Sequence, residues 1–347
     1  MRHKVTLGSV HKGSEAFIIA EHFVNKEKSI LYIARDDREI YALQSKLFWL
    51  LPKADILIFR SWDQIPYDNV SPSREIQSER IKSLYQLSVN KQKKIILSSV
   101  NAIIQRTVDK SFIKKNYVTI FVNQKLNFNH FIQQLISLGY QRTSVVREKT
   151  DFAIRGSIVD IFIVDRKNPL RIDFFDNNIE SIHEFDRLTQ KRLLKIENEK
   201  IYIHPSSELL INDETITLFR KNFREIFSNY RLSQVYNSFS ESILPPGGEQ
   251  FLPFFLEKME TFFNFVNDCQ VIVNSQFNDL LENRIENIND FFKARKQLND
   301  NFYLKPDQLY LSSNETNHYL SQSDLIKFSE FTGEKSKKTN KIGRAHV

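Results

Sequence analysis

The feature that most narrowly constrains the fold lies in the first 115 residues, where short apolar runs alternate with segments of helical period. The runs at 29–35, 54–59 and 94–98 are apolar along almost their whole length, as is typical of strands buried on both faces. Between the first two, apolar side chains repeat at helical spacing from residue 40 to residue 50, and Asp36 can cap that helix. Apolar strands separated by helices predict a parallel α/β sheet.

The pattern changes between residues 117 and 204. A helix is predicted over 128–138, where Gly139 provides a plausible end. Short β-rich runs separated by turn signals then follow, at 140–147, 154–164, 170–175, 179–186 and 193–203. We predict that this segment is an α+β unit, with a helix on a mostly antiparallel sheet.

Residues 205–331 return to helices and one buried strand. Helices are predicted over 214–230 and 275–297, and the strand is the run CQVIVN at 269–274. The chain therefore divides into three segments, 1–116, 117–204 and 205–331, followed by a basic tail at 332–347.

Composition limits the class of protein. The 347 residues are enough for two or three compact units, and their 8 glycines argue against chemistry built on several Gly-rich phosphate loops. The single cysteine, Cys269, rules out a disulfide framework and a Cys-rich zinc site, which is typical of a reducing compartment. No apolar run approaches the ~20 residues of a membrane helix. We expect a soluble, cytoplasmic protein with no membrane partner.

The net charge of +7 is concentrated at one end of the chain. Residues 333–347 hold five Lys or Arg residues and one Glu, so more than half of the excess lies there. The body is only mildly basic, which is weak support for nucleic-acid binding. The last six residues, 342–347, correspond to one reading frame of a common sequencing adapter. We interpret 332–347 as a truncation scar outside the fold.

The segment 8–15 (GSVHKGSE) has the glycine spacing of a phosphate-binding loop. Gly8 and Gly13 are in place, but Ser14 stands where the motif has Lys, and Glu15 stands where a Ser or Thr would bind Mg²⁺. A carboxylate at that position repels phosphate. We predict a structural turn that binds no nucleotide.

The run 170–175 (LRIDFF) places one set of side chains on the face away from the core. With a period of two, Arg171, Asp173 and Phe175 share that face. Arginine beside an exposed aromatic ring is typical of a protein–protein hot spot, and Arg155 on a neighbouring run can join it. In the alternative reading, Phe175 packs under a loop and Arg171 pairs with Asp173.

Other kinds of site have little support. Four aspartates could form a metal-dependent nuclease cluster if their carboxylates converged, and the alternative is that they are surface and turn residues: Asp160, Asp173, Asp176 and Asp186. The eight His residues show no spacing that favours a metal site. No arrangement of Ser, His and Asp indicates a catalytic site, so we expect neither catalytic residues nor bound metal.

Several short motifs, taken in chain order, resemble segments of the bacterial transcription-repair coupling factor (Mfd) family. Residues 65–68 (IPYD), followed by Ser71-Pro72 and by SER at 78–80, resemble the family's LPYE…SP…SERL stretch. Residues 155–162 (RGSIVDIF) resemble its RGxxxDxF strand, and residues 171–190 resemble RLDFFDDEIDSIRxFDxxSQ. The order and spacing hold over roughly residues 5–300.

This resemblance implies a fold and a partner. The family module is a split RecA-like domain with an inserted α+β domain, which here gives 1–116 and 205–331 to the split domain and 117–204 to the insert. The insert is the docking surface for UvrA. The family's contact residues match three positions here: Arg155, Arg171 and Phe175.

The resemblance also implies an activity for the whole family. Full-length members use ATP and Mg²⁺ to translocate on double-stranded DNA and to displace stalled RNA polymerase, through domains that follow this module. We expect the present chain to hold no cofactor and to be inactive as an enzyme. The near alternative is a UvrB-like excision-repair helicase fragment, but that family keeps a working phosphate loop, so Ser14 and Glu15 favour the coupling factor. A nucleic-acid-binding β-domain is a third reading.

Overall fold

A computed structural model of the chain describes residues 4–11, 13–90, 92–297, 302–329 and 337–338. The first segment and the insert contain, in chain order, β1 (Lys4–Gly8), α1 (Glu15–Asn25), β2 (Ile30–Ala34), α2 (Asp37–Leu50), β3 (Asp55–Phe59), α3 (Arg74–Val89), β4 (Lys94–Ser99), α4 (Val100–Ile103), α5 (Lys110–Lys115), β5 (Val118–Ile120), α6 (Phe128–Ser137), β6 (Gln141–Arg142), β7 (Asp151–Arg155), β8 (Ile158–Ile161), β9 (Leu170–Phe175), β10 (Asn178–Phe185), β11 (Arg192–Ile196) and β12 (Ile201–Ile203). The remainder contains α7 (Asp213–Ile226), η1 (Tyr230–Leu232), α8 (Gln234–Ser240), η2 (Gly248–Phe255), η3 (Phe262–Phe265), β13 (Gln270–Val273), α9 (Phe277–Gln297), α10 (Pro306–Leu309), α11 (Ser313–Ser321), β14 (Asp324–Phe328) and β15 (Lys337–Lys338).

The larger sheet is parallel and is built from both flanks of the insert. Its strand order is β15-β1-β14-β13-β2-β4-β3. β13 lies between β14 and β2, with Gln270 opposite Ile30. Because strands from before and after the insert pair in one sheet, the predicted fold class, a split parallel-sheet domain interrupted by an α+β unit, is confirmed.

Helices cover this sheet on both sides. Ile30 and Tyr32 of β2 face a core completed by α1 and α2, whereas Leu31 and Ile33 face the core formed with α3, α4, α5 and α9. All four side chains are fully buried. Burial on both faces explains why β2 is apolar at every position instead of at every second one.

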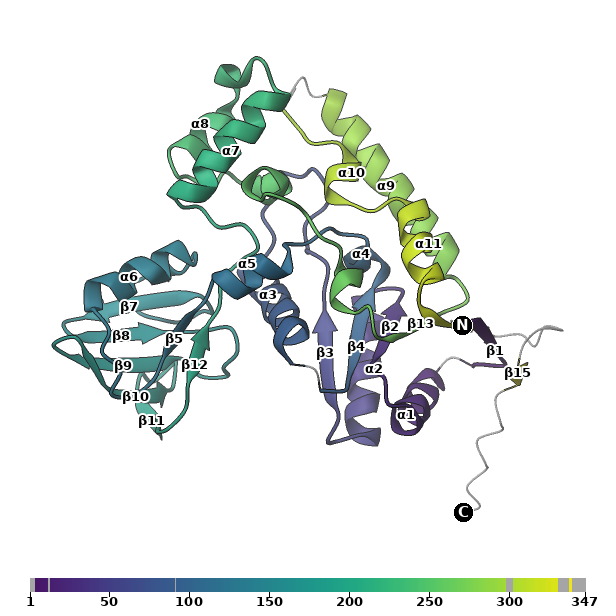
Figure 1. Cartoon of the computed structure of the whole chain (residues 1–347), viewed down its shortest axis with the longest axis horizontal. Helices are drawn as coiled ribbons and strands as arrows, with labels where there is room; N and C mark the ends of the chain where they lie inside the picture. Colours follow the sequence, from purple (N-terminus) through teal and green to yellow (C-terminus); the bar gives the residue numbers. More distant parts are fainter. Residues whose placement is uncertain (1–3, 12, 91, 298–301, 330–336, 339–347) are drawn as a thin grey trace.

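The insert forms a second unit beside α3 (Figure 1). Its six-stranded sheet has the order β11-β10-β9-β8-β7-β6 and is antiparallel except for the β6–β7 pair. α6 packs on one face, where Phe131 contacts Phe174 with 5.8 Å between ring centroids. The first and last strands of the insert, β5 and β12, pair with each other, with Val118 opposite Ile203. The chain therefore enters and leaves the unit side by side.

A buried ion pair joins α3 to the segment that follows β12. Arg80 Nε donates to Glu208 Oε2 at 2.7 Å, and both side chains are almost fully buried. Trp62 Nε1 donates to the same carboxylate oxygen at 3.2 Å. α3 also contacts the insert itself, because Arg74 pairs with Asp151 at 3.3 Å. These contacts fix the exit of the insert against the larger domain.

An aromatic cluster fills the space under α7, α8 and η2. Phe219 and Phe223 on α7 lie at its centre, and the Phe219 ring stacks on Phe255 with 4.7 Å between centroids. This cluster accounts for several of the 29 phenylalanines.

The structure corrects several element predictions. The run 154–164 is a hairpin of β7 and β8, because the chain turns at Gly156 with φ of 61°. The run 193–203 splits into β11 and β12, which lie in different sheets.

Two further corrections concern the third segment. The helix expected over 214–230 ends at Ile226. The expectation of a single buried strand in residues 205–331 is also wrong, because β14 lies between β1 and β13. Apart from β15, the predicted tail at 332–347 lies outside the described residues. Among the helices that the structure describes, none has the length and apolar character needed to span a membrane.

Candidate partner-binding surface

The face of the six-stranded sheet that turns away from α6 carries the predicted binding residues in cross-strand rows. In one row Arg155 lies opposite Ile158, which lies opposite Asp173. In the next row Asp160 lies opposite Arg171. Residues opposite one another in antiparallel strands project from the same side of a sheet. Arg155, Asp173 and Arg171 therefore share one face, as the period-two pattern predicts.

Arg155 and Phe175 lie at one end of this face and are exposed. Phe175 is 67% exposed, although it is a large apolar side chain. The Phe174 amide donates to the Ser157 carbonyl at 2.9 Å, so Phe175 lies beside the turn that follows Arg155. Gly156 in that turn and Asp176 after Phe175 both have positive φ, which ends both strands at this edge.

Arg171 is not part of the exposed patch. Its Nε and one terminal nitrogen donate to the two oxygens of Asp160 at 2.7 and 2.8 Å, and the other terminal nitrogen donates to the Gln190 carbonyl. Only 13% of the Arg171 side chain is exposed, and its guanidinium lies 4.7 Å from the Phe185 ring centroid. The prediction that Arg171 contributes to an exposed patch with Arg155 and Phe175 is wrong in this respect, because the guanidinium of Arg171 is held by the fully buried Asp160 carboxylate. The alternative pairing with Asp173 is wrong too.

Asp173 has a different partner. Arg192 on β11 donates to both of its oxygens, at 2.8 and 3.0 Å, and the Ser181 hydroxyl donates to one of them. Burial, followed by the charge of Arg192, lowers the pKa of the nearby His183. Arg192 itself keeps 48% of its side chain exposed, so it extends the surface toward β11.

The roles of Asp160, which is buried under this face, and of Arg192, which extends it, were not predicted from the sequence. Both are identified by cross-strand register, which the alternation within one strand does not reveal. The available signal was the opposite charge of Asp160 and Arg171 on successive β-rich runs, and it becomes useful only when the hairpin at Gly156 is known.

The four aspartates considered as a metal cluster have separate partners. Asp160 binds Arg171, Asp173 binds Arg192, and Asp186 accepts hydrogen bonds from Leu188 and Thr189 in its own turn. Asp176 is exposed after β9. Within the described residues, no group of three or more His, Cys, Asp or Glu side chains could hold a metal ion.

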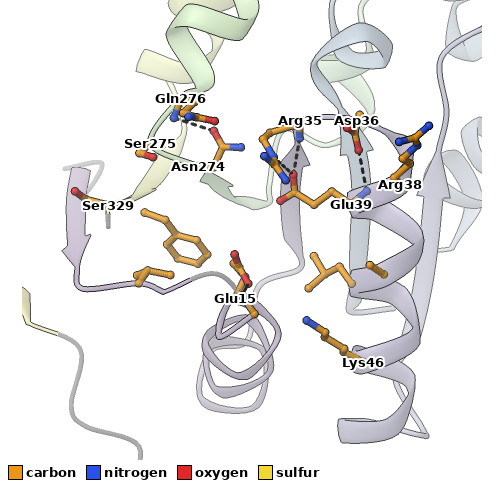
Figure 2. Close-up of a pocket in the computed structure, with 15 residues that line it drawn as sticks. Glu15, Arg35, Asp36, Arg38, Glu39, Lys46, Asn274, Ser275, Gln276 and Ser329 are labelled. Atoms are coloured by element: carbon orange, nitrogen blue, oxygen red, sulfur yellow. Dashed lines mark hydrogen bonds and ion pairs between the residues drawn. The ribbon is translucent and has the colours of Figure 1, made fainter. Parts of the chain in front are cut away.

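The degenerate phosphate loop opens onto a cavity of about 600 Å³ at the carboxyl ends of β2 and β13 (Figure 2). Glu15 begins α1 and projects into this cavity, and Glu39, Arg35 and Lys46 line the α2 side. Arg35 is engaged by Glu39 at 2.9 Å.

The geometry of the loop does not fit a nucleoside triphosphate. The Gly13 amide, which would face a phosphate, donates instead to Glu15 Oε2 at 2.6 Å. The Ser14 hydroxyl donates to the His11 carbonyl at 2.7 Å and supplies no positive charge. The Glu15 carboxylate thus accepts the hydrogen bond from the Gly13 amide that a bound phosphate would need. Its negative charge also repels phosphate. Gly8 ends β1, and residue 12 lies outside the described residues.

Comparison with known proteins finds a family that the insert matches. Residues 118–209 match the family described as the UvrB interaction domain. These residues run from the first residue of β5 to just past Glu208, so the match covers the whole insert and its exit.

Nearly the whole chain also matches curated relatives. It is 30% identical to the transcription-repair-coupling factor of Haemophilus influenzae over 94% of this chain and 28% of that protein. The same-named proteins of Rickettsia bellii and Escherichia coli are each 29% identical, over 96% and 78% of this chain and 30% and 23% of their own lengths. Over nearly its whole length, the chain is similar to part of these transcription-repair-coupling factors. It spans under a third of the length of the relatives it matches.

Proposed function

We propose that this transcription-repair-coupling factor module recruits UvrA through the exposed end of its inserted sheet. The observation that carries the proposal is the 67% exposure of Phe175 beside the exposed Arg155, on the face opposite the buried core. Aromatic and arginine anchors of this kind dominate the free energy of many protein–protein interfaces. The match of residues 118–209 to the UvrB interaction domain supports an interaction role for the same unit.

Within this proposal the three family contact positions have two roles. Arg155 and Phe175 contact UvrA directly. Arg171 is a positioning residue, because its guanidinium donates two hydrogen bonds to the Asp160 carboxylate and packs on the Phe185 ring. Only the small exposed part of Arg171 can touch a partner.

Titration of purified UvrA against wild-type and variant chains tests the proposal. Phe175→Ala and Arg155→Ala are each expected to weaken binding by about thirtyfold, equivalent to ~2 kcal/mol, with unchanged melting temperatures. Leu188→Ala is the matched control, since Leu188 is 84% exposed on the loop after the opposite end of β10. Equal binding by all four proteins would refute this surface as the interface.

A charge-conserving variant distinguishes the two possible roles of Arg171. Arg171→Lys keeps the charge but cannot hold both Asp160 oxygens in a planar fork. If Arg171 is a positioning residue, Arg171→Lys lowers both the affinity for UvrA and the melting temperature. Loss of affinity alone, with unchanged melting, would instead make Arg171 a direct contact.

For the whole protein we propose the activity of the family: ATP-dependent translocation on double-stranded DNA that displaces stalled RNA polymerase in the cytoplasm. The present module would contribute UvrA recruitment and no nucleotide chemistry, because Glu15 blocks its degenerate loop. Calorimetric titration of ATP with Mg²⁺ is expected to give no binding. Micromolar affinity would favour the UvrB-like helicase alternative.

A further inference from the structure

A second cavity lies between the loop after β3 and helix α9, on the larger domain. Its volume is about 330 Å³, and its wall includes Trp62, Gln64 and Ile65 from the loop and Arg284, Asn287 and Phe291 from α9. Asn101 on α4 also contributes to it. None of these residues belongs to the inserted sheet or to the degenerate phosphate loop.

Arg284 is the unusual member of this wall. Its Nε is buried with no hydrogen-bond partner, and no ion pair joins it to an acidic group in the described part of the chain. Burial lowers the pKa of its guanidinium, opposed only by the Tyr310 phenol. An arginine that has lost part of its hydration without gaining a counter-charge destabilises the folded state. Folding alone therefore does not account for a cation here.

The side chains around Arg284 indicate which kind of ligand could pair with its guanidinium. The side-chain amides of Asn101 and Asn287 line the same cavity and can donate hydrogen bonds, whereas Gln64 Nε2 already donates to the Asp68 carbonyl at 3.0 Å. Two apolar side chains of its wall are exposed, Ile65 at 52% and Phe291 at 38%. The acidic residue of the wall, Asp63, already accepts the Ser73 amide at 2.9 Å. One unpaired cation, amide donors and adjoining apolar groups fit a carboxylate with an apolar neighbour.

We propose that this cavity binds an acidic–apolar peptide segment of a partner protein, with a Glu or Asp carboxylate of that segment on the Arg284 guanidinium and its apolar neighbour on Ile65 and Phe291. A nucleic-acid backbone fits less well. It requires several cations in a row, whereas Arg284 is the single Lys or Arg side chain that lines this cavity.

Tryptophan spectroscopy can test the proposal directly. The chain has two tryptophans, and Trp49 is 80% exposed on α2, so a Trp49→Phe background leaves Trp62 in the cavity wall as the sole reporter. The probes are the blocked tripeptides acetyl-Leu-Glu-Phe-amide and acetyl-Leu-Gln-Phe-amide, inorganic phosphate, and a single-stranded oligonucleotide. We expect a saturable change in the Trp62 indole signal with the Glu peptide and at least tenfold weaker binding of the Gln peptide.

Variants of the cationic residue and of an apolar residue of the cavity wall test the assignment. Arg284→Met should abolish the preference for the Glu peptide and raise the melting temperature by roughly 1–2 °C, because an unpaired cation is removed. Ile65→Ala should weaken binding several-fold at unchanged melting, which keeps the test valid even if the Arg284 variant folds poorly. Leu244→Ala, an exposed apolar residue outside the cavity, is the control.

Three results would overturn the proposal. Equal binding of the two peptides would remove the role of the carboxylate. Tighter binding of phosphate or of the oligonucleotide than of the Glu peptide would make this an anion or nucleic-acid site. A loss of melting temperature in Arg284→Met that Arg284→Lys restores would make Arg284 a structural residue. Because the probes contain no UvrA, failure here leaves the proposed UvrA surface untouched.

Discussion

The contrast between Arg171 and Phe175 shows how much of a site is decided at single residues. Period-two alternation predicted the correct face for both. Whether a side chain on that face is free depends on its cross-strand neighbour, and here Asp160 on β8 closes the fork of Arg171. A partner on another strand is encoded by register, which depends on the hairpin turn at Gly156 and cannot be derived from the strand's own composition.

The Asp160–Arg171 pair makes a stability prediction. Asp160→Asn leaves a mostly buried guanidinium without its counter-charge, so we expect the free energy of unfolding to fall by about 2 kcal/mol. Urea unfolding followed by circular dichroism measures it. Asp176→Asn, at an exposed position with φ of 51° that Asn tolerates, is the control and should change little. Equal effects of the two variants would show that the pair contributes no stability.

A buried carboxyl predicts a pH dependence. Burial raises the pKa of Glu249 above its ordinary 4.5, although Ser71 and Gln77 donate hydrogen bonds that oppose this rise. The folded state therefore binds the proton more tightly than the unfolded state. This contribution to stability is fully present below pH 4.5 and is lost as the pH rises through the folded pKa.

Glu249→Gln removes the titrating group, so its unfolding free energy should fall less than that of wild type between pH 5 and pH 7. Urea titrations at these two values measure the difference. Parallel pH profiles for the two proteins would contradict the assignment.

At the scale of elements, strands were predicted correctly where most of their residues are buried. They were missed where a strand is identified only by pairing with strands distant in the sequence. β2 and β4 are buried at every position and β13 at all but its first, and these strands were found because such burial makes most of their residues apolar. β14 was missed because Asp324 and Lys327 interrupt its apolar run, and its place between β1 and β13 is set by partners about 50 and 320 residues away. Nothing local in the sequence records such pairing.

The Arg80–Glu208 pair links elements that are distant along the chain, α3 and the exit of the insert. Glu208→Gln should lower the free energy of unfolding by about 3 kcal/mol, because a buried guanidinium then lacks its counter-charge. Glu79→Gln is the control, since Glu79 pairs with Arg60 at 3.5 Å and is 35% exposed. Calorimetric melting compares the two variants. A loss no larger than that of the control would contradict the role of the pair.

At the scale of the molecule, the larger domain and the insert have separate cores. One core of the larger domain includes Cys269, which directly precedes β13, and the core of the insert lies between α6 and its sheet. Burial raises the pKa of Cys269 to about 12. The thiol therefore reports only the opening of the larger domain.

Alkylation of Cys269 at pH 8 is expected to be at least a hundredfold slower in the native chain than in urea, since both access and the thiolate are suppressed. The single cysteine makes the readout unambiguous in mass spectrometry. In intermediate urea the insert should lose structure without a matching rise in labelling. Simultaneous change of both signals would show that the two cores unfold as one cooperative unit.

The pairing of β5 with β12 has an evolutionary and engineering consequence. With Val118 opposite Ile203, the two ends of the insert lie about 5 Å apart, a gap that a short turn spans. A unit of this kind could thus be inserted into or exchanged within the larger domain at almost no cost in loop-closure entropy. Because its two ends are adjacent, the unit of residues 117–204 is suited to transfer into another protein, at a site where the ends of two antiparallel strands lie next to each other.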